Sequence, residues 1–161
     1  MYRVENTQGE KIRNGLLSKG KTIAVAESVT AGLLQYALST IPDASKFLQG
    51  GITAFNVAQK YKHLRVEPLH ALSVNCVSGK VAEEMALHCC ELFSSDWGVG
   101  ITGYASPAPE SGNKSFAYFA IAFGGRIVEK GKLSPKKKDP PAIQQEYVSA
   151  ILSRLEKVIK R

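Results

Sequence analysis

The sequence predicts an α/β fold, with a mixed, mostly parallel sheet in a three-layer α/β/α arrangement. Early in the chain, short apolar runs alternate with amphipathic stretches, and this order of strands and helices is typical of parallel sheets. Later, two apolar runs flank Gly124-Gly125, which indicates a hairpin of antiparallel strands. No repeat, low-complexity tract or long linker interrupts the 161 residues, so we expect a single domain over 1–161.

Two strands and three helices are predicted in the first part of the chain. Residues 9–19 have the spacing of a short amphipathic helix, and the compact apolar run 22–27 favours a buried strand. Apolar residues recur at helical spacing over 31–41, directly before a proline that ends the helix. The segment 50–56 opens with paired glycines and predicts a second strand, followed by a polar helix that carries Lys60.

A longer helix is predicted to begin after Ser78, because serine is a preferred residue for capping helix N-termini. Its apolar stripe, which we expect to face the core, consists of Val81, Met85, Cys89 and Leu92. The two cysteines of this helix are therefore interpreted as core residues rather than reactive ones.

The last part of the chain predicts three strands and a helix. The strands are expected over 97–103, 116–123 and 126–132, the last two forming the hairpin. Asp139 is the predicted cap of a final amphipathic helix that runs to Arg161, and the two prolines after Asp139 fit its first turn.

The composition is that of a globular protein, with 44% hydrophobic and 22% charged residues. No apolar stretch approaches the roughly 20 residues that span a bilayer, and the N-terminus lacks the apolar core of a signal peptide. We therefore expect a cytoplasmic protein without membrane attachment. The three cysteines form a poor disulfide framework, which favours reduced thiols.

The formal net charge of +7 does not by itself identify a partner. Much of the excess lies in Lys136, Lys137 and Lys138 and near the C-terminal end, and both segments are typical of solvated edges. Because no aromatic residues are interleaved with these cations, we do not expect nucleic acid as a partner. The three histidines are scattered and no metal-ligand spacing occurs, so we expect neither a metal nor another cofactor.

The first candidate site is the segment from Glu27 to Gly32, where a buried strand ends and a helix is predicted to begin at once. Such a junction directs free backbone N–H groups and the helix dipole at a bound anion. Ser28 on this turn is a candidate nucleophile if a base lies nearby. Simple helix capping by the hydroxyl residues explains the same pattern, and the residues alone favour that alternative.

The second candidate is Lys60, just after the strand predicted over 50–56. A desolvated lysine beside a serine loses its proton readily and serves as a base. The alternative is a solvated helix lysine, for which Lys62 is a ready example, and the sequence alone does not separate the two.

The third candidate is Thr102-Gly103-Tyr104, where a strand enters a loop rich in Gly, Ser and Pro. This is a common ligand-facing feature, and it is equally typical of a plain loop. Because substrates of α/β sheets sit beyond the carboxyl ends of the strands, we expect one rim to hold Glu27, Ser28, Asn56, Thr102 and Gly103.

Taken together and in order, these segments resemble the CinA C-terminal family. AESVTAG resembles its AES-C-T-G/A-G segment, GGITAFNVAQK its G-G-x-x-x-Y-x-x-x-x-K segment, and GITGYASP its TGIAGP loop. Asn75-Cys76-Val77-Ser78 is similar to the start of its G-A-V-S-x-x-V-A stretch. The similarity runs from about Lys21 to Gly125, and several motifs at matching spacing make it far more specific than any single motif.

The resemblance implies a metal-independent amidohydrolase that converts nicotinamide mononucleotide to nicotinic acid mononucleotide and ammonia, a step of pyridine nucleotide salvage. It assigns Ser28 as the nucleophile and Lys60 as the group that assists it. Residues expected to contact the substrate are Glu27, Thr30, Ala31, Gly32, Phe55, Asn56, Thr102, Gly103 and Tyr104. The resemblance also suggests a homo-oligomer and a stand-alone form of the domain, since larger CinA proteins carry a further N-terminal domain.

Three departures from the family pattern bear on this expectation. Phe55 stands at the family's tyrosine position, and losing one acid–base group costs about 10²–10⁴-fold in rate. Tyr61 and Tyr104 lie in neighbouring segments and are candidates to replace the hydroxyl. The TGIAGP loop has become TGYASP, and the Gly-Thr pair of the later K-P-x-G-T-x-W stretch is absent. The alternatives are therefore a catalytically impaired nucleotide- or protein-binding module, or an amidase on another substrate.

Overall fold

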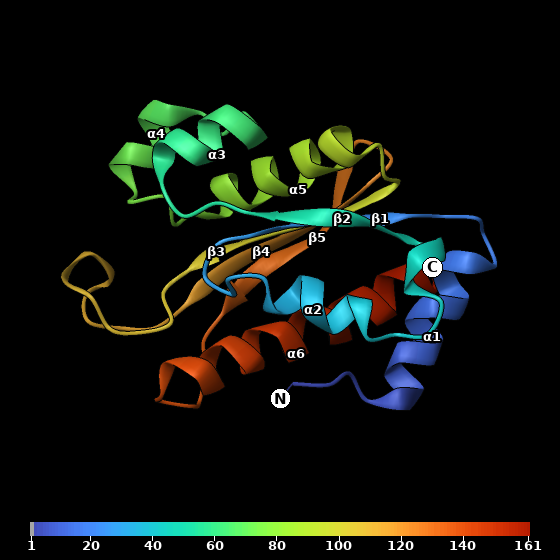
Figure 1. The fold of residues 1–161 in the computed structure, drawn as a ribbon. Helices are drawn as coiled ribbons and strands as arrows, with labels where there is room; N and C mark the ends of the chain where they lie inside the picture. Colours follow the sequence, from blue (N-terminus) through green and yellow to red (C-terminus); the bar gives the residue numbers. More distant parts are fainter. Residues whose placement is uncertain (1) are drawn as a thin grey trace.

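The computed structural model describes residues 2–161, so that only Met1 of the predicted domain lies outside it. A five-stranded sheet lies between two helical layers (Figure 1). The strands are β1 (Ile23–Glu27), β2 (Leu48–Thr53), β3 (Trp97–Gly103), β4 (Ala117–Phe123) and β5 (Arg126–Leu133). The helices on one face are α1 (Asn6–Leu17), α2 (Leu33–Ser39) and α6 (Pro140–Ile159). Those on the other face are α3 (Val57–Leu64), α4 (Pro68–Ser73) and α5 (Gly79–Phe93).

The sheet has the order β2-β1-β3-β4-β5, and its first half is parallel. Strand β1 pairs in parallel with both β2 and β3, whereas the β3–β4 and β4–β5 pairs are antiparallel. The predicted mixed α/β sheet is confirmed, but it is half parallel rather than mostly parallel. Between β3 and β4 lies a single turn of 3₁₀ helix (Pro109–Ser111) in place of a crossover α-helix, and β4 returns antiparallel; the turn at Gly124-Gly125 then reverses the chain into β5.

Apolar side chains pack on both faces of the sheet. The larger cluster joins α1, α2 and α6 to residues such as Val25 and Ile101, and a smaller cluster lies under α3, α4 and α5. On the α5 side β3 presents Gly98 and Gly100, where an added Cβ would lie 2.3 Å from a backbone oxygen of α5. The absence of side chains there lets α5 lie directly on the strand.

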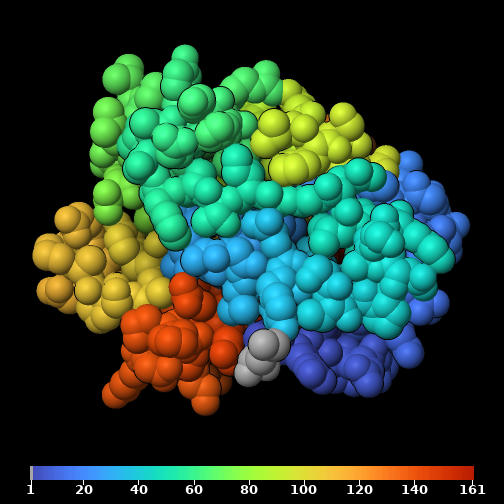
Figure 2. Space-filling model, viewed as in Figure 1, coloured from blue at the N-terminus to red at the C-terminus, as the bar shows by residue number. Residues whose placement is uncertain are grey.

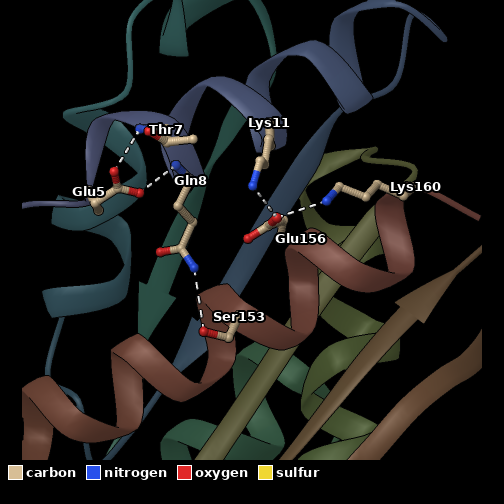
Figure 3. A network of polar contacts seen from close by, with 7 residues as sticks. All are labelled: Glu5, Thr7, Gln8, Lys11, Ser153, Glu156 and Lys160. Carbon is tan, nitrogen blue, oxygen red and sulfur yellow. Dashed lines mark hydrogen bonds and ion pairs between the residues drawn. The ribbon is translucent and has the colours of Figure 1, made fainter.

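Polar contacts at the surface join α1 to α6 (Figure 3). Gln8 Nε2 donates to Ser153 Oγ at 3.4 Å, and Glu156 forms ion pairs with both Lys11 and Lys160. Exposed pairs of this kind contribute little, about 0–1 kcal/mol each, so the buried apolar residues hold the two helices together.

Several predicted boundaries are corrected by the structure. The helix expected over 31–41 begins at Leu33, because Ala31 and Gly32 have left-handed backbones with φ of 51° and 97°. The second strand ends at Thr53 instead of Asn56, and Asn56 caps α3 through the N–H of Gln59. The predicted caps at Ser78 and Asp139 are confirmed.

Leu92 was expected in the core stripe of α5, and this prediction is wrong: its side chain is 49% exposed. The buried face of α5 is centred on Met85, Ala86 and Cys89, and Leu92 lies at its edge in the last turn. None of the described helices combines the length and the apolar character needed to cross a membrane.

Candidate functional site

The loops that follow the parallel strands converge at the carboxyl ends of β1 and β3 (Figure 1). Residues of these loops line a cavity of about 400 Å³. Four short segments contribute its walls: 28–29 after β1, 55–60 around the start of α3, 75–77 before α5, and 102–105 at the end of β3 and just beyond it. The parallel half of the sheet therefore brings together segments that are far apart in the chain.

Ser28 and Lys60 meet in the wall of this cavity. Lys60 Nζ donates to Ser28 Oγ at 2.9 Å and to the carbonyl oxygen of Ala54 at 2.8 Å. The cap at Asn56 starts α3 one turn before Lys60, and this directs the lysine back to the end of β1. The Lys60 side chain is fully buried, so the alternative prediction of a solvent-exposed helix lysine is wrong.

Burial lowers the pKa of Lys60 from 10.5 to about 8, because the ammonium form loses its hydration. The neighbouring thiol of Cys76 opposes this shift only in part, and burial raises the pKa of that thiol. Near neutral pH, a substantial minority of Lys60 amines is therefore neutral and able to take a proton from Ser28.

Glu27 does not line the cavity, although it was expected to contact the substrate. Its carboxylate is fully buried and accepts the hydroxyl of Thr30. The same carboxylate accepts the N–H groups of Gly32, Leu34 and Gln35 at 2.7–3.2 Å. The N–H groups at the start of α2, which were predicted to face a bound anion, are thus hydrogen-bonded to Glu27 itself.

Thr30, Ala31 and Gly32 also lie outside the cavity lining. Thr30 is buried, and the left-handed backbones of Ala31 and Gly32 turn the chain from β1 into α2. These three residues and Glu27 therefore shape the turn that presents Ser28, and the structure places none of them in the cavity wall.

The other five residues expected at the substrate do line the cavity: Phe55, Asn56, Thr102, Gly103 and Tyr104. The Phe55 ring is 65% exposed at the mouth. The Thr102 hydroxyl donates to the carbonyl of Cys76 at 2.6 Å. Asn75 Nδ2 donates to the Tyr104 hydroxyl oxygen at 3.1 Å, whereas Tyr61 is exposed and outside the lining.

Sequence reasoning missed six lining residues: Val29, Val57, Asn75, Cys76, Val77 and Ala105. The segment 75–77 was noted only for its resemblance to a family stretch. Its backbone is left-handed at Asn75 and Cys76, with φ of 51° and 61°. An asparagine before a helix cap was the one local signal of such a turn.

Helix α6 holds the two loops that flank the cavity. Gln144 Nε2 donates to the carbonyl oxygen of Val29 at 2.9 Å, next to Ser28. The Tyr147 hydroxyl donates to the carbonyl oxygen of Tyr104 at 2.8 Å. These contacts fix the serine turn and the loop after β3 to one rigid element.

The arrangement suits nucleophilic chemistry. A serine hydrogen-bonded to a desolvated lysine is a nucleophile with its base in place. Within residues 2–161, no group of three or more His, Cys, Asp or Glu side chains is placed to hold a metal ion.

Comparisons with known proteins place these features in one family. A model of the CinA C-terminal domain matches residues 5–159. A CinA-like protein from Prochlorococcus marinus is 41% identical over 118 residues, which are 72% of this chain and 28% of that protein. A putative competence-damage inducible protein from Moorella thermoacetica is 36% identical over 73% of this chain and 29% of its own length. The chain thus spans less than a third of the length of these curated relatives.

Solved structures of similar length share the fold. The crystal structure of a competence-damaged protein (CinA) superfamily protein from Enterobacter cloacae superposes with a TM-score of 0.89 at 25% identity, covering 99% of this chain and 96% of that one. A superfamily member from Escherichia coli gives a TM-score of 0.88 at 27% identity, covering 95% of this chain and 89% of that one.

Proposed function

The chain belongs to the CinA C-terminal domain family, and from this premise we propose that it hydrolyses the carboxamide of nicotinamide mononucleotide to nicotinic acid mononucleotide and ammonia. The observation that carries the proposal is the buried hydrogen bond between Lys60 Nζ and Ser28 Oγ. It supports acyl transfer through serine, the chemistry that the family resemblance implies. We assign the step to pyridine nucleotide salvage in the cytoplasm.

The proposed reaction begins when Ser28 Oγ bonds to the carboxamide carbon and passes its proton to neutral Lys60 Nζ. Lys60 returns this proton to the departing nitrogen, which leaves as ammonia, and a nicotinoyl ester remains on Ser28. Water then attacks the ester carbon and gives a proton to Lys60, which returns it to Ser28 Oγ as the acid is released. Water is the only co-reactant consumed.

The negative oxygen of the tetrahedral intermediate needs hydrogen-bond donors. The backbone N–H of Val29, which lines the cavity, has no protein acceptor among the described residues. Val29 follows Ser28 directly, so we assign the oxyanion to this N–H group. Glu27 supports it indirectly, because its carboxylate already occupies the donors at the start of α2.

Tyr104 takes the place of the hydroxyl that Phe55 lacks in this proposal. Its ring lies in the cavity wall and its oxygen accepts from Asn75, which leaves the phenolic hydrogen free to donate. Removal of that hydroxyl in Tyr104→Phe should cost at least about 10-fold in rate.

The test measures ammonia release from nicotinamide mononucleotide by wild type, Ser28→Ala and Lys60→Ala. We expect both variants to fall by at least about 10²-fold. Lys62→Ala is the matched control, because Lys62 is exposed on the same helix and should retain full activity. A wild type that stays silent at high enzyme concentration contradicts the proposal and leaves a binding module instead.

A further inference from the structure

A second hollow of about 580 Å³ borders the catalytic cavity and is strongly basic. Its lining includes five lysines and no acidic residue. We call it the lysine groove and define it by Lys114, Lys132, Lys136, Lys137 and Lys138. In the described part of the chain, none of these five ammonium groups forms an ion pair with a carboxylate.

Two contacts order the groove, and neither is an ion pair with one of its ammonium groups. The carboxylate of Glu146 accepts the backbone N–H groups of Lys136 and Lys137 at 2.9–3.1 Å, which holds that loop against α6. Lys132 Nζ lies 4.3 Å from the centre of the Phe116 ring in the groove wall. The positive charges therefore stand on a fixed backbone and an aromatic surface, and their ammonium groups remain open to an anion.

The catalytic cavity lacks the counter-charge that a phosphorylated substrate requires. Lys60 is the one cationic residue among the described residues of its lining. That amine is already engaged by Ser28 and the carbonyl of Ala54, and it must lose its charge to act as a base. A phosphate group beside it would favour the ammonium form and oppose this role.

The groove and the cavity are neighbours, because Tyr104 of the cavity lining contacts Phe116 of the groove lining. Ala105 lines the cavity and Pro107 lines the groove. The Tyr104 and Phe116 rings lie 5.3 Å apart, and Tyr104 N–H donates to the carbonyl of Phe116. In Figure 2 the loop between β3 and β4 (gold), which carries these residues, lies between the α3–α4 region (green) and the start of α6 (orange).

We propose that the lysine groove binds the phosphate group of the substrate whose carboxamide occupies the catalytic cavity. This inference rests on the proposed function and deepens it, because it makes the chain selective for a nucleotide over the corresponding nucleoside. Phosphate oxygens accept charge-assisted hydrogen bonds from lysine, and several lysines share the charge of one dianion.

The kinetic test compares nicotinamide mononucleotide with nicotinamide riboside, which lacks the phosphate. The triple variant K136Q/K137Q/K138Q should raise KM for the mononucleotide at least about 10-fold, change kcat less than about 3-fold, and leave KM for the riboside unchanged. The control variant K62Q/R126Q/K157Q removes the same number of charges from exposed positions elsewhere and should behave as wild type. Equal losses in the two triple variants would overturn the proposal, since they reflect net charge alone.

Calorimetric binding of nicotinamide mononucleotide separates this inference from the deamidase proposal. If wild type binds the mononucleotide without hydrolysing it and the groove variant binds at least about 10-fold more weakly, the groove assignment stands and the deamidase proposal fails. If the groove variant binds the mononucleotide as wild type does, the assignment is wrong. If that variant also loses the binding of a short single-stranded oligonucleotide that wild type shows, the groove is a nucleic-acid site instead.

Discussion

Lys60 shows how one buried side chain acquires its chemistry from opposing effects. Its ammonium form gains two hydrogen bonds, to Ser28 and to the carbonyl of Ala54, but it has no contact with solvent. Loss of hydration is the larger effect, and it lowers the pKa of the amine to about 8. An exposed lysine is protonated almost completely at neutral pH, so burial is what makes the residue usable as a base.

The pH dependence of kcat/KM follows from this pKa. Neutral Lys60 is the active form, so kcat/KM should rise with pH, reach half its maximum near pH 8 and level off above about pH 9, with roughly a tenth of the maximal value at pH 7. Steady-state rates between pH 6 and 9.5 check this prediction. The substrate phosphate ionises near pH 6, about two units below the pKa of Lys60, so it affects only the acid end of this range. A flat profile would show that Lys60 is not the base.

At the scale of single elements, Glu27, the last residue of β1, stabilises the start of α2. The Glu27 carboxylate accepts four hydrogen bonds and lies at the N-terminus of the helix, which carries partial positive charge. The turn between the two elements needs left-handed backbone at Ala31 and Gly32. The position of Ser28 therefore depends on a buried acid that does not itself line the cavity.

Glu27→Gln should lower the free energy of unfolding by about 2–4 kcal/mol. The amide oxygen is a weaker acceptor than a carboxylate oxygen, and the amide nitrogen faces donors that then have no partner. Urea denaturation at pH 7 measures the change, with Glu10→Gln, at an exposed position of α1, as the control. A loss below about 0.5 kcal/mol would mean that the helix does not depend on this carboxylate.

The contact between α5 and β3 gives a second prediction at this scale. In Gly100→Ala the new Cβ would lie 2.3 Å from the carbonyl oxygen of Ala82 and 2.7 Å from the backbone nitrogen of Ala86. Backbone atoms cannot rotate away, so the helix must move, and we expect a loss of at least about 2 kcal/mol.

Gly9→Ala in α1 is the matched control. Its Cβ would meet neighbours only at 3.5 Å or more, which is ordinary contact. Alanine is the better helix former, so this variant should gain about 0.5–1 kcal/mol. Urea denaturation of the two variants should therefore give changes of opposite sign, and equal changes would contradict the close packing described for α5.

At the scale of the whole molecule, the last helix supports a cavity that is lined by residues between 28 and 105. Helix α6 contacts the turn after β1 through Gln144 and the loop after β3 through Tyr147. The same helix begins beside the lysine groove. The cavity, the groove and the helix that supports them therefore form one assembly at one end of the sheet.

Gln144→Ala tests this support. Without its hydrogen bond to Val29 the serine turn is less restrained, so kcat should fall about 10-fold while the midpoint of thermal unfolding shifts by less than about 3 °C. Gln145→Ala, at the exposed neighbouring position, should leave both quantities unchanged. A parallel fall in kcat and in the midpoint would indicate general destabilisation rather than positioning.

Much of the fold was predictable from the sequence, because the residues within and next to each strand or helix carry the pattern that predicts it. The alternation of apolar runs, the hairpin glycines and the caps at Ser78 and Asp139 are local signals, and the structure confirms them. Where predictions were wrong, at Leu92 and at the start of α2, the outcome depended on contacts with other segments.

For the candidate site, the sequence by itself determined the residue types that could react, a serine after a buried strand and a lysine early in a helix. Only the tertiary structure decided that Lys60 rather than Lys62 is desolvated, that Glu27 fills the helix N-terminus, and that the lysine groove borders the cavity. The physical reason is that burial, pKa and charge pairing depend on distances between segments that lie far apart in the chain, as Ser28 and Lys60 do.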